Sequence, residues 1–252
     1  THRAYTRLDS QGISDSFLPR TNYIRACSSE DFALRAPTWN GEPLTRFYRA
    51  ANRRMLNPTG ARTLIACIIP PGVGHVHTVS SVAFSSTDLL LRFHGLQASL
   101  PFDFLLRTTG RADLLGSGYD MFPVPEDGAW SRPLTGRLLR LTCLTEHFRH
   151  LWEGRALDSA LAWTSDDLRL RAYATDTSAG WTSHVALRSD FERRQALVEI
   201  DVLASIALGL THDQLTTIYR TQFPVLRQYE RERLYGQTGR TIPTAKTAVS
   251  HV

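Results

Sequence analysis

The chain has 252 residues, of which 42% are hydrophobic and 21% are charged, and its formal net charge is +5. This length and composition suit a soluble globular protein with a core in one large or two unequal domains. The longest apolar run, Leu64 to Ile69, is far shorter than the ~20 residues that cross a bilayer. The first residues, THRAYTRLDS, lack the apolar core of a signal peptide. We therefore expect a cytoplasmic protein with no membrane partner.

The three cysteines indicate the redox compartment of the protein, and the basic residues indicate the kind of partner it could bind. Cys27, Cys67 and Cys143 are odd in number and widely spaced, which favours a reducing compartment over a disulfide framework or a zinc knuckle. Almost all positive charge is arginine, with Lys246 as the only lysine. Arginine suits phosphate oxygens and the guanine edge, so the charge is compatible with nucleic acid. A GC-rich genome, which encodes arginine in place of lysine, explains the same ratio, and both interpretations stay open.

The first half of the chain, up to residue 130, has the pattern of an α/β region. Its short β-type runs predict strands over 45–51, 63–69 and 75–84, and its Pro/Gly-rich stretches predict turns over 58–60 and 70–74. Residues 87–110 have a helical pattern that Pro101 should break or kink, and 121–128 predict an extended connector. The sheet is expected to be mixed in strand direction, so the fold class is α/β (α+β).

Residues 131–235 predict a mainly helical region. Ser189 to Glu192 and Thr211 to Gln214 both fit the capping box that begins a helix, and the first of these helices should end at Gly209. A further helix follows Pro224. The polar stretch 236–252 is poorly patterned and is expected to be a mobile tail.

The stretch IIPPGVGHVHT, residues 68–78, could be a phosphate loop, a metal site or a turn. A dinucleotide fingerprint needs its third glycine where His77 stands, and a Walker loop needs a lysine that is absent here. His75 and His77 would share one face of a strand, which suits two metal ligands, but no third ligand is evident. We therefore predict a turn between two strands and no stoichiometric metal.

The motifs of other catalytic classes are also missing. The sequence has no Gly-x-Ser-x-Gly elbow, no His-Glu-x-x-His, and no lysine for a nuclease site apart from Lys246. Asn57-Pro58-Thr59-Gly60 lacks the second proline and the aromatic residue of the Asn/Asp-Pro-Pro-Tyr/Phe loop of amino-methyltransferases. Asp201 interrupts an apolar helix, which suits a buried hydrogen-bonding or ion-paired group better than a catalytic acid. We predict that this chain has no catalytic residue and binds no cofactor.

Several segments together resemble a known family. They are ANRRMLNPTGARTLIACIIPPG, LQASLPFDFLLRTTG, MFPVP, RLLRLTCLTEHFRHLW and RRQALVEIDVLASIALGLTHDQLTTIYRTQFPVLRQYERERLYGQTGR. In this order they are similar to the C-terminal target-recognition region of type IIG and PglX-like (BREX, DISARM) adenine-N6 DNA methyltransferases, enzymes of restriction–modification and phage defence. The resemblance runs from about Arg46 to Arg240, and Gly236 stands where the family usually has Asp.

The resemblance implies a specificity role for this chain. Residues 1–130 would form the target-recognition domain, and the helices of 131–235 would pack on it or on a methyltransferase domain. S-adenosylmethionine and the catalytic loop would belong to that methyltransferase portion, upstream in the polypeptide. A first residue of Thr1 fits a fragment of such a protein. The implied partners are double-stranded DNA and the methyltransferase domain.

The residues that contact DNA must be predicted from their chemistry. Candidates are the basic residues that flank the predicted turns and helix, which are Arg49, Arg53, Arg54, Arg62, His75, His77, Arg107 and Arg111. For any one of them the alternative is a solvated arginine or a packing histidine. Because Arg53, Arg54 and Arg62 flank the apolar strand, their substitution is expected to leave the fold intact. The alternative function is a protein–protein assembly module of a defence complex; a stand-alone enzyme of another type is disfavoured by the missing motifs.

Overall fold

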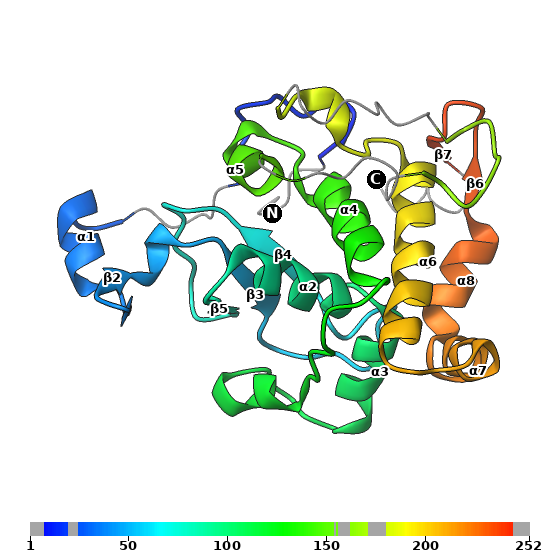
Figure 1. The fold of residues 1–252 in the computed structure, drawn as a ribbon, viewed down its shortest axis with the longest axis horizontal. Coiled ribbons are helices and arrows are strands. Elements are labelled where there is room, and N and C mark those ends of the chain that lie inside the picture. The colour runs from blue at the N-terminus through cyan, green and yellow to red at the C-terminus, as the bar shows by residue number, and fades with distance from the viewer. Residues whose placement is uncertain (1–7, 20–24, 154, 156–161, 171–179, 244–252) are drawn as a thin grey trace, which may run out of the picture.

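The computed structural model of the chain describes residues 8–19, 25–153, 155, 162–170 and 180–243. Small antiparallel sheets and several helices make up a mixed α/β fold, so the predicted class is confirmed (Figure 1). The largest sheet has three strands, β3 (Arg49–Arg53), β4 (Ala66–Ile69) and β5 (Val79–Val82), in the order β4-β3-β5. The other two sheets are hairpins of two strands each, β1 (Thr38–Trp39) with β2 (Glu42–Pro43) and β6 (Leu234–Tyr235) with β7 (Thr241–Ile242).

The strands differ from the sequence prediction in direction and length. Among the described residues every strand pair is antiparallel, so the sheets are not mixed. Both flanking strands of the main sheet pair with β3, where Ala51 lies opposite Cys67 on one side and Ser81 on the other. The strand predicted over 45–51 begins only at Arg49, after a 3-10 turn at Leu44–Arg46. The turns at 58–60 and 70–74 are present, and Gly72 has a φ of +81° that favours glycine.

The helical stretch 87–110 forms two helices, α2 (Thr87–Gln97) and α3 (Leu100–Thr108). Ser86 and Ser99 cap them, because each side-chain oxygen accepts a hydrogen bond from a backbone N–H in the first turn. Pro101 lies in the first turn of α3, where a missing N–H costs nothing. The break therefore falls two residues before Pro101, which helps to start the second helix.

The second half is helical, as predicted. Its longer helices are α4 (Ser131–Thr142), α6 (Asp190–Ala207), α7 (His212–Gln222) and α8 (Pro224–Glu232). Both predicted capping boxes are present, at Ser189 and Thr211, and Gly209 follows α6 with a φ of +70°. The shorter elements of the described chain are α1 (Ser29–Arg35), α5 (Arg149–Trp152), and 3-10 turns at Gly116–Met121, Glu146–Phe148 and Ser183–Val185.

A continuous hydrophobic core joins the two halves. Helix α2 lies against the main sheet on one side and α4 on the other, and α4 packs in turn against α6 (Figure 1). Leu91 and Leu96 of α2, Leu134 and Leu138 of α4, and Ile200 of α6 are buried in the same cluster. Helices α2 and α4 approach closely because α2 has glycine at position 95; a Cβ there would lie 2.7 Å from Leu134 Cδ2. The domain boundary at residue 130 stays a prediction, and it crosses this core.

Two further predictions concern the C-terminal tail and membrane-spanning helices. Residues 234–235 pair with 241–242, so the first part of the predicted tail 236–252 forms a hairpin. Residues 244–252 lie outside the described chain. Within the described residues, no helix has the length and apolar character needed to cross a membrane.

Candidate nucleic-acid interface

Two of the predicted DNA-binding arginines point into the protein and share a buried carboxylate. Asp103, on α3, has no exposed surface. Its Oδ2 accepts from Arg62 Nε at 2.8 Å and its Oδ1 from Arg107 Nε at 2.9 Å. The backbone N–H groups of Thr63 and Leu64 also donate to it. This cluster, which we call the Asp103 hub, links the chain before β4 to α3.

Further donors of these two arginines are directed to backbone carbonyls. Arg62 Nη2 donates to the carbonyls of Ala98 and Ser99, the break between α2 and α3, at 2.9 Å each. Arg107 Nη1 and Nη2 donate to further carbonyls, and its guanidinium lies 4.3 Å from the ring centroid of Phe223, before α8. The side chains of Arg62 and Arg107 are only 23% and 9% exposed. Arg62 does more than flank the strand, because its guanidinium neutralises a buried carboxylate, and we now expect its replacement to destabilise the fold.

Arg49 is also an interior residue. It is 4% exposed, and its Nη2 donates to the carbonyl of Val73 while Nη1 lies 3.4 Å from Ser81 Oγ. Burial lowers the pKa of its guanidinium. Arg49 thus fastens the loop between β4 and β5 to the sheet.

The other arginines come together at one end of the main sheet. Arg53 ends β3 opposite Val79, and the N–H of Arg54 donates to the carbonyl of Thr78 at 2.9 Å. On the other side, the carbonyl of Arg54 accepts from Leu114 N at 2.9 Å. These backbone bonds place residues 53–56 between the loop that carries His77 and the segment 111–114.

We refer to Arg53, Arg54, His77 and Arg111 as the sheet-end cluster. Arg53, His77 and Arg111 are exposed, and Arg54 is half-buried and pairs with Asp113 at 3.2 Å. Three guanidiniums and one paired carboxylate, that of Asp113, therefore lie at this end of the sheet. Of the eight predicted DNA-binding residues, these four lie on backbone segments that meet at one end of the main sheet.

The two histidines do not share a strand face, because both precede β5. His75 lies in the loop, with Nε2 2.8 Å from Ser81 Oγ and Nδ1 3.1 Å from the carbonyl of Val76. His77 lies in the turn that leads into β5. The prediction that both histidines lie on one face of a strand is therefore wrong, whereas the predicted turn is present. In the described part of the chain, no three His, Cys, Asp or Glu side chains are grouped as a metal site would need.

Asp201 is a buried hydrogen-bonding group, as predicted. Its Oδ1 accepts from the N–H of Leu100, at the start of α3, at 2.7 Å. Burial raises the pKa of this carboxyl to about 6, although the nearby cations Arg62 and Arg194 oppose the shift. The carboxyl therefore links α6 to α3.

The comparisons with known proteins add no identification: no protein family model, no curated protein and no solved structure matches this chain.

Proposed function

We propose that the chain binds double-stranded DNA through the sheet-end cluster. The observation that carries this proposal is that Arg53, Arg54 and Arg111 lie on neighbouring backbone segments at one end of the main sheet, where, among the described residues, Asp113 alone pairs with them. Guanidiniums at this end of the sheet can neutralise phosphates, and a planar fork can also read guanine in the major groove. The interior arginines Arg49, Arg62 and Arg107 hold the scaffold that presents the sheet-end cluster.

Within this proposal, the chain serves as the specificity portion of an adenine-N6 DNA methyltransferase in cytoplasmic restriction–modification or phage defence. The support for this finer role is the ordered resemblance of segments between about Arg46 and Arg240. S-adenosylmethionine would then be bound by the methyltransferase portion, and this chain would supply no catalytic group.

The test is DNA binding measured by fluorescence anisotropy over a series of salt concentrations. A triple variant, Arg53→Gln, Arg54→Gln and Arg111→Gln, removes the positive charge of the cluster. For every phosphate that the variant no longer neutralises, the slope of log K against log salt should flatten by about 0.9. If one arginine reads guanine, its single variant should instead lose about 1–3 kcal/mol on the cognate site alone.

The matched control removes three exposed arginines from α7, α8 and the residue after α8, by Arg220→Gln, Arg231→Gln and Arg233→Gln. It changes the net charge equally, so it should retain the wild-type slope if DNA binds locally at the cluster. Equal weakening in both triple variants would indicate a diffuse charge effect. Unchanged binding in the cluster variant would contradict the proposal.

One observation favours the assembly module instead. Val198, Val202 and Ile206 are exposed on α6 and recur every four residues, so they form an apolar stripe. A chain that binds DNA weakly and without salt dependence, and that no longer binds its methyltransferase partner after Val202→Asp, would support this second function.

A further inference from the structure

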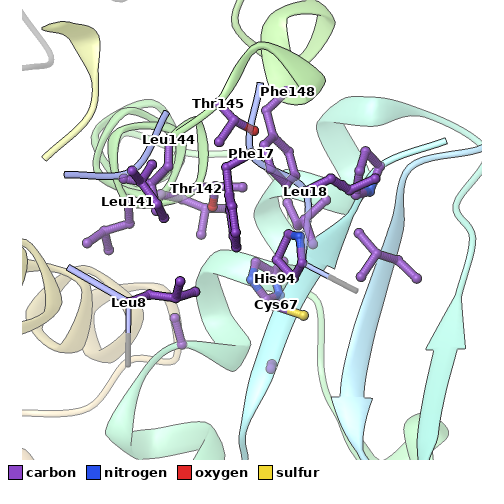
Figure 2. Close-up of a pocket in the computed structure, with 18 of the residues that line it drawn as sticks. Leu8, Phe17, Leu18, Cys67, His94, Leu141, Thr142, Leu144, Thr145 and Phe148 are labelled. Carbon is purple, nitrogen blue, oxygen red and sulfur yellow. The ribbon is translucent and has the colours of Figure 1, made fainter. Parts of the chain in front are cut away.

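An apolar pocket lies between the N-terminal segment 8–19, β4 and α4 (Figure 2). Its volume is about 480 Å³, and it opens to solvent. Cavities of roughly 300–1,000 Å³ hold small organic ligands in proteins. Figure 2 shows that its walls carry large apolar side chains, among them Leu8, Phe17, Leu18, Leu141, Leu144 and Phe148.

Two buried side chains in this lining each have one polar atom without a hydrogen-bond partner among the described residues. His94 and Thr145 are each 4% exposed, and His94 Nδ1 and Thr145 Oγ1 are the unpaired atoms. Burial lowers the pKa of His94 to about 4, against a smaller opposing effect of Gln97, so its imidazole is neutral at pH 7. Buried polar atoms are almost always hydrogen-bonded in proteins. Because neither atom is accessible to solvent, both lie behind the pocket surface and do not face its open space.

Arg193 supplies the only cationic side chain in the described lining. Its Nη1 donates to the carbonyls of Leu141 and Leu187, both at 3.1 Å, which fixes the guanidinium between α4 and α6. Burial lowers the pKa of this guanidinium, although the nearby negative charge of Asp190 opposes the shift. Within the described residues Arg193 forms no ion pair and only its Nη1 makes a hydrogen bond, so no carboxylate neutralises its charge.

We propose that this pocket binds a small amphipathic carboxylic acid, with its hydrocarbon chain against the apolar walls and its carboxylate on Arg193. A carboxylate accepts two parallel hydrogen bonds from a guanidinium, and the low-dielectric lining strengthens them. The apolar walls match an alkyl chain rather than a polar body such as a sugar. This site is separate from the sheet-end cluster, and it does not depend on the proposed DNA binding.

A charge series of ligands tests the site on the unmodified chain. Decanoate, decanol and decylammonium share one alkyl length, and their binding can be compared by titration calorimetry at pH 7.5. We expect decanoate to bind at least about tenfold more tightly than decanol, with decylammonium weakest, because charged hydrogen bonds are stronger than neutral ones. Absence of decanoate binding, or equal affinity for all three ligands, would overturn the proposal.

Variants then locate the site. Arg193→Met should weaken decanoate at least about tenfold and leave decanol unchanged, whereas Arg193→Lys should restore part of the preference. Arg220→Met, at an exposed position of α7, is the control for net charge. Leu144→Trp should fill the pocket and abolish binding of all three ligands. Decanoate affinity that survives both Arg193→Met and Leu144→Trp would place the ligand elsewhere and refute the assignment.

Discussion

The Asp103 hub gives the most quantitative prediction, which is the effect of Asp103→Asn on stability. Asparagine keeps the shape of the side chain but removes its charge and turns one acceptor oxygen into a donor. That donor would face the guanidiniums of Arg62 and Arg107, which stand 2.8 and 2.9 Å from the present carboxylate oxygens. Breaking a buried ion pair from one side costs about 3–5 kcal/mol. At about 2–4 °C per kcal/mol for a protein of this size, the melting temperature should fall by roughly 6–20 °C.

The assay is thermal unfolding followed by circular dichroism at pH 7. The control is Glu42→Gln, which breaks the exposed pair of Glu42 with Arg46 and should leave the melting temperature close to wild type. A double-mutant cycle with Arg62→Ala measures the coupling, and the double variant should be destabilised by less than the two single variants combined. An Asp103→Asn chain that melts together with Glu42→Gln would refute the structural role of the hub.

Three further outcomes follow from the core and its buried groups. Gly95→Ala should lower the free energy of unfolding in urea by about 1–3 kcal/mol, because the added methyl group meets Leu134. Adding Leu134→Val should recover part of that stability. Full wild-type stability of the Gly95→Ala chain would contradict the close approach of the two helices. Asp201→Asn should stabilise the fold at pH 7 and not below about pH 4. The folded pKa of about 6 exceeds the ordinary value of 3.8, so the wild type loses stability as pH rises through this range. Residues 1–130 alone should show no cooperative melt, since their core continues into α4 and α6; a sharp transition would support the predicted boundary.

Features set by a few neighbouring residues could be predicted from the sequence. The two capping boxes, at Ser189 and Thr211, each depend on residues within four positions of one another. The helix end at Gly209 is local in the same way. The turns at 58–60 and 70–74 depend on proline and glycine in the same way. For the strand over 45–51, the local pattern was insufficient, because pairing with β4 and β5 decides where β3 begins.

Which of the predicted arginines belong to the candidate site was harder to predict, because the interior arginines meet their partners across long sequence distances. Arg62 and Asp103 are 41 positions apart, and nothing near Arg62 in the sequence indicates that it faces a carboxylate. The spacing of four between Asp103 and Arg107 was the one local signal of the hub, since it places both on one face of a helix. An arginine has the same appearance in a sequence whether it contacts phosphate or a buried acid.

The interior arginines also change what the net charge of +5 means. Arg62 and Arg107 are bound to Asp103 in the hub, and Arg49 is buried. These three arginines therefore count toward the total charge but are not available to DNA. If the three arginines of the sheet-end cluster each contact one phosphate, the slope of log K against log salt should be close to −2.7, at about 0.9 per phosphate. A much steeper slope that survives the cluster variant would assign DNA binding to other exposed arginines, whereas a slope near zero would leave the cluster facing water or a protein.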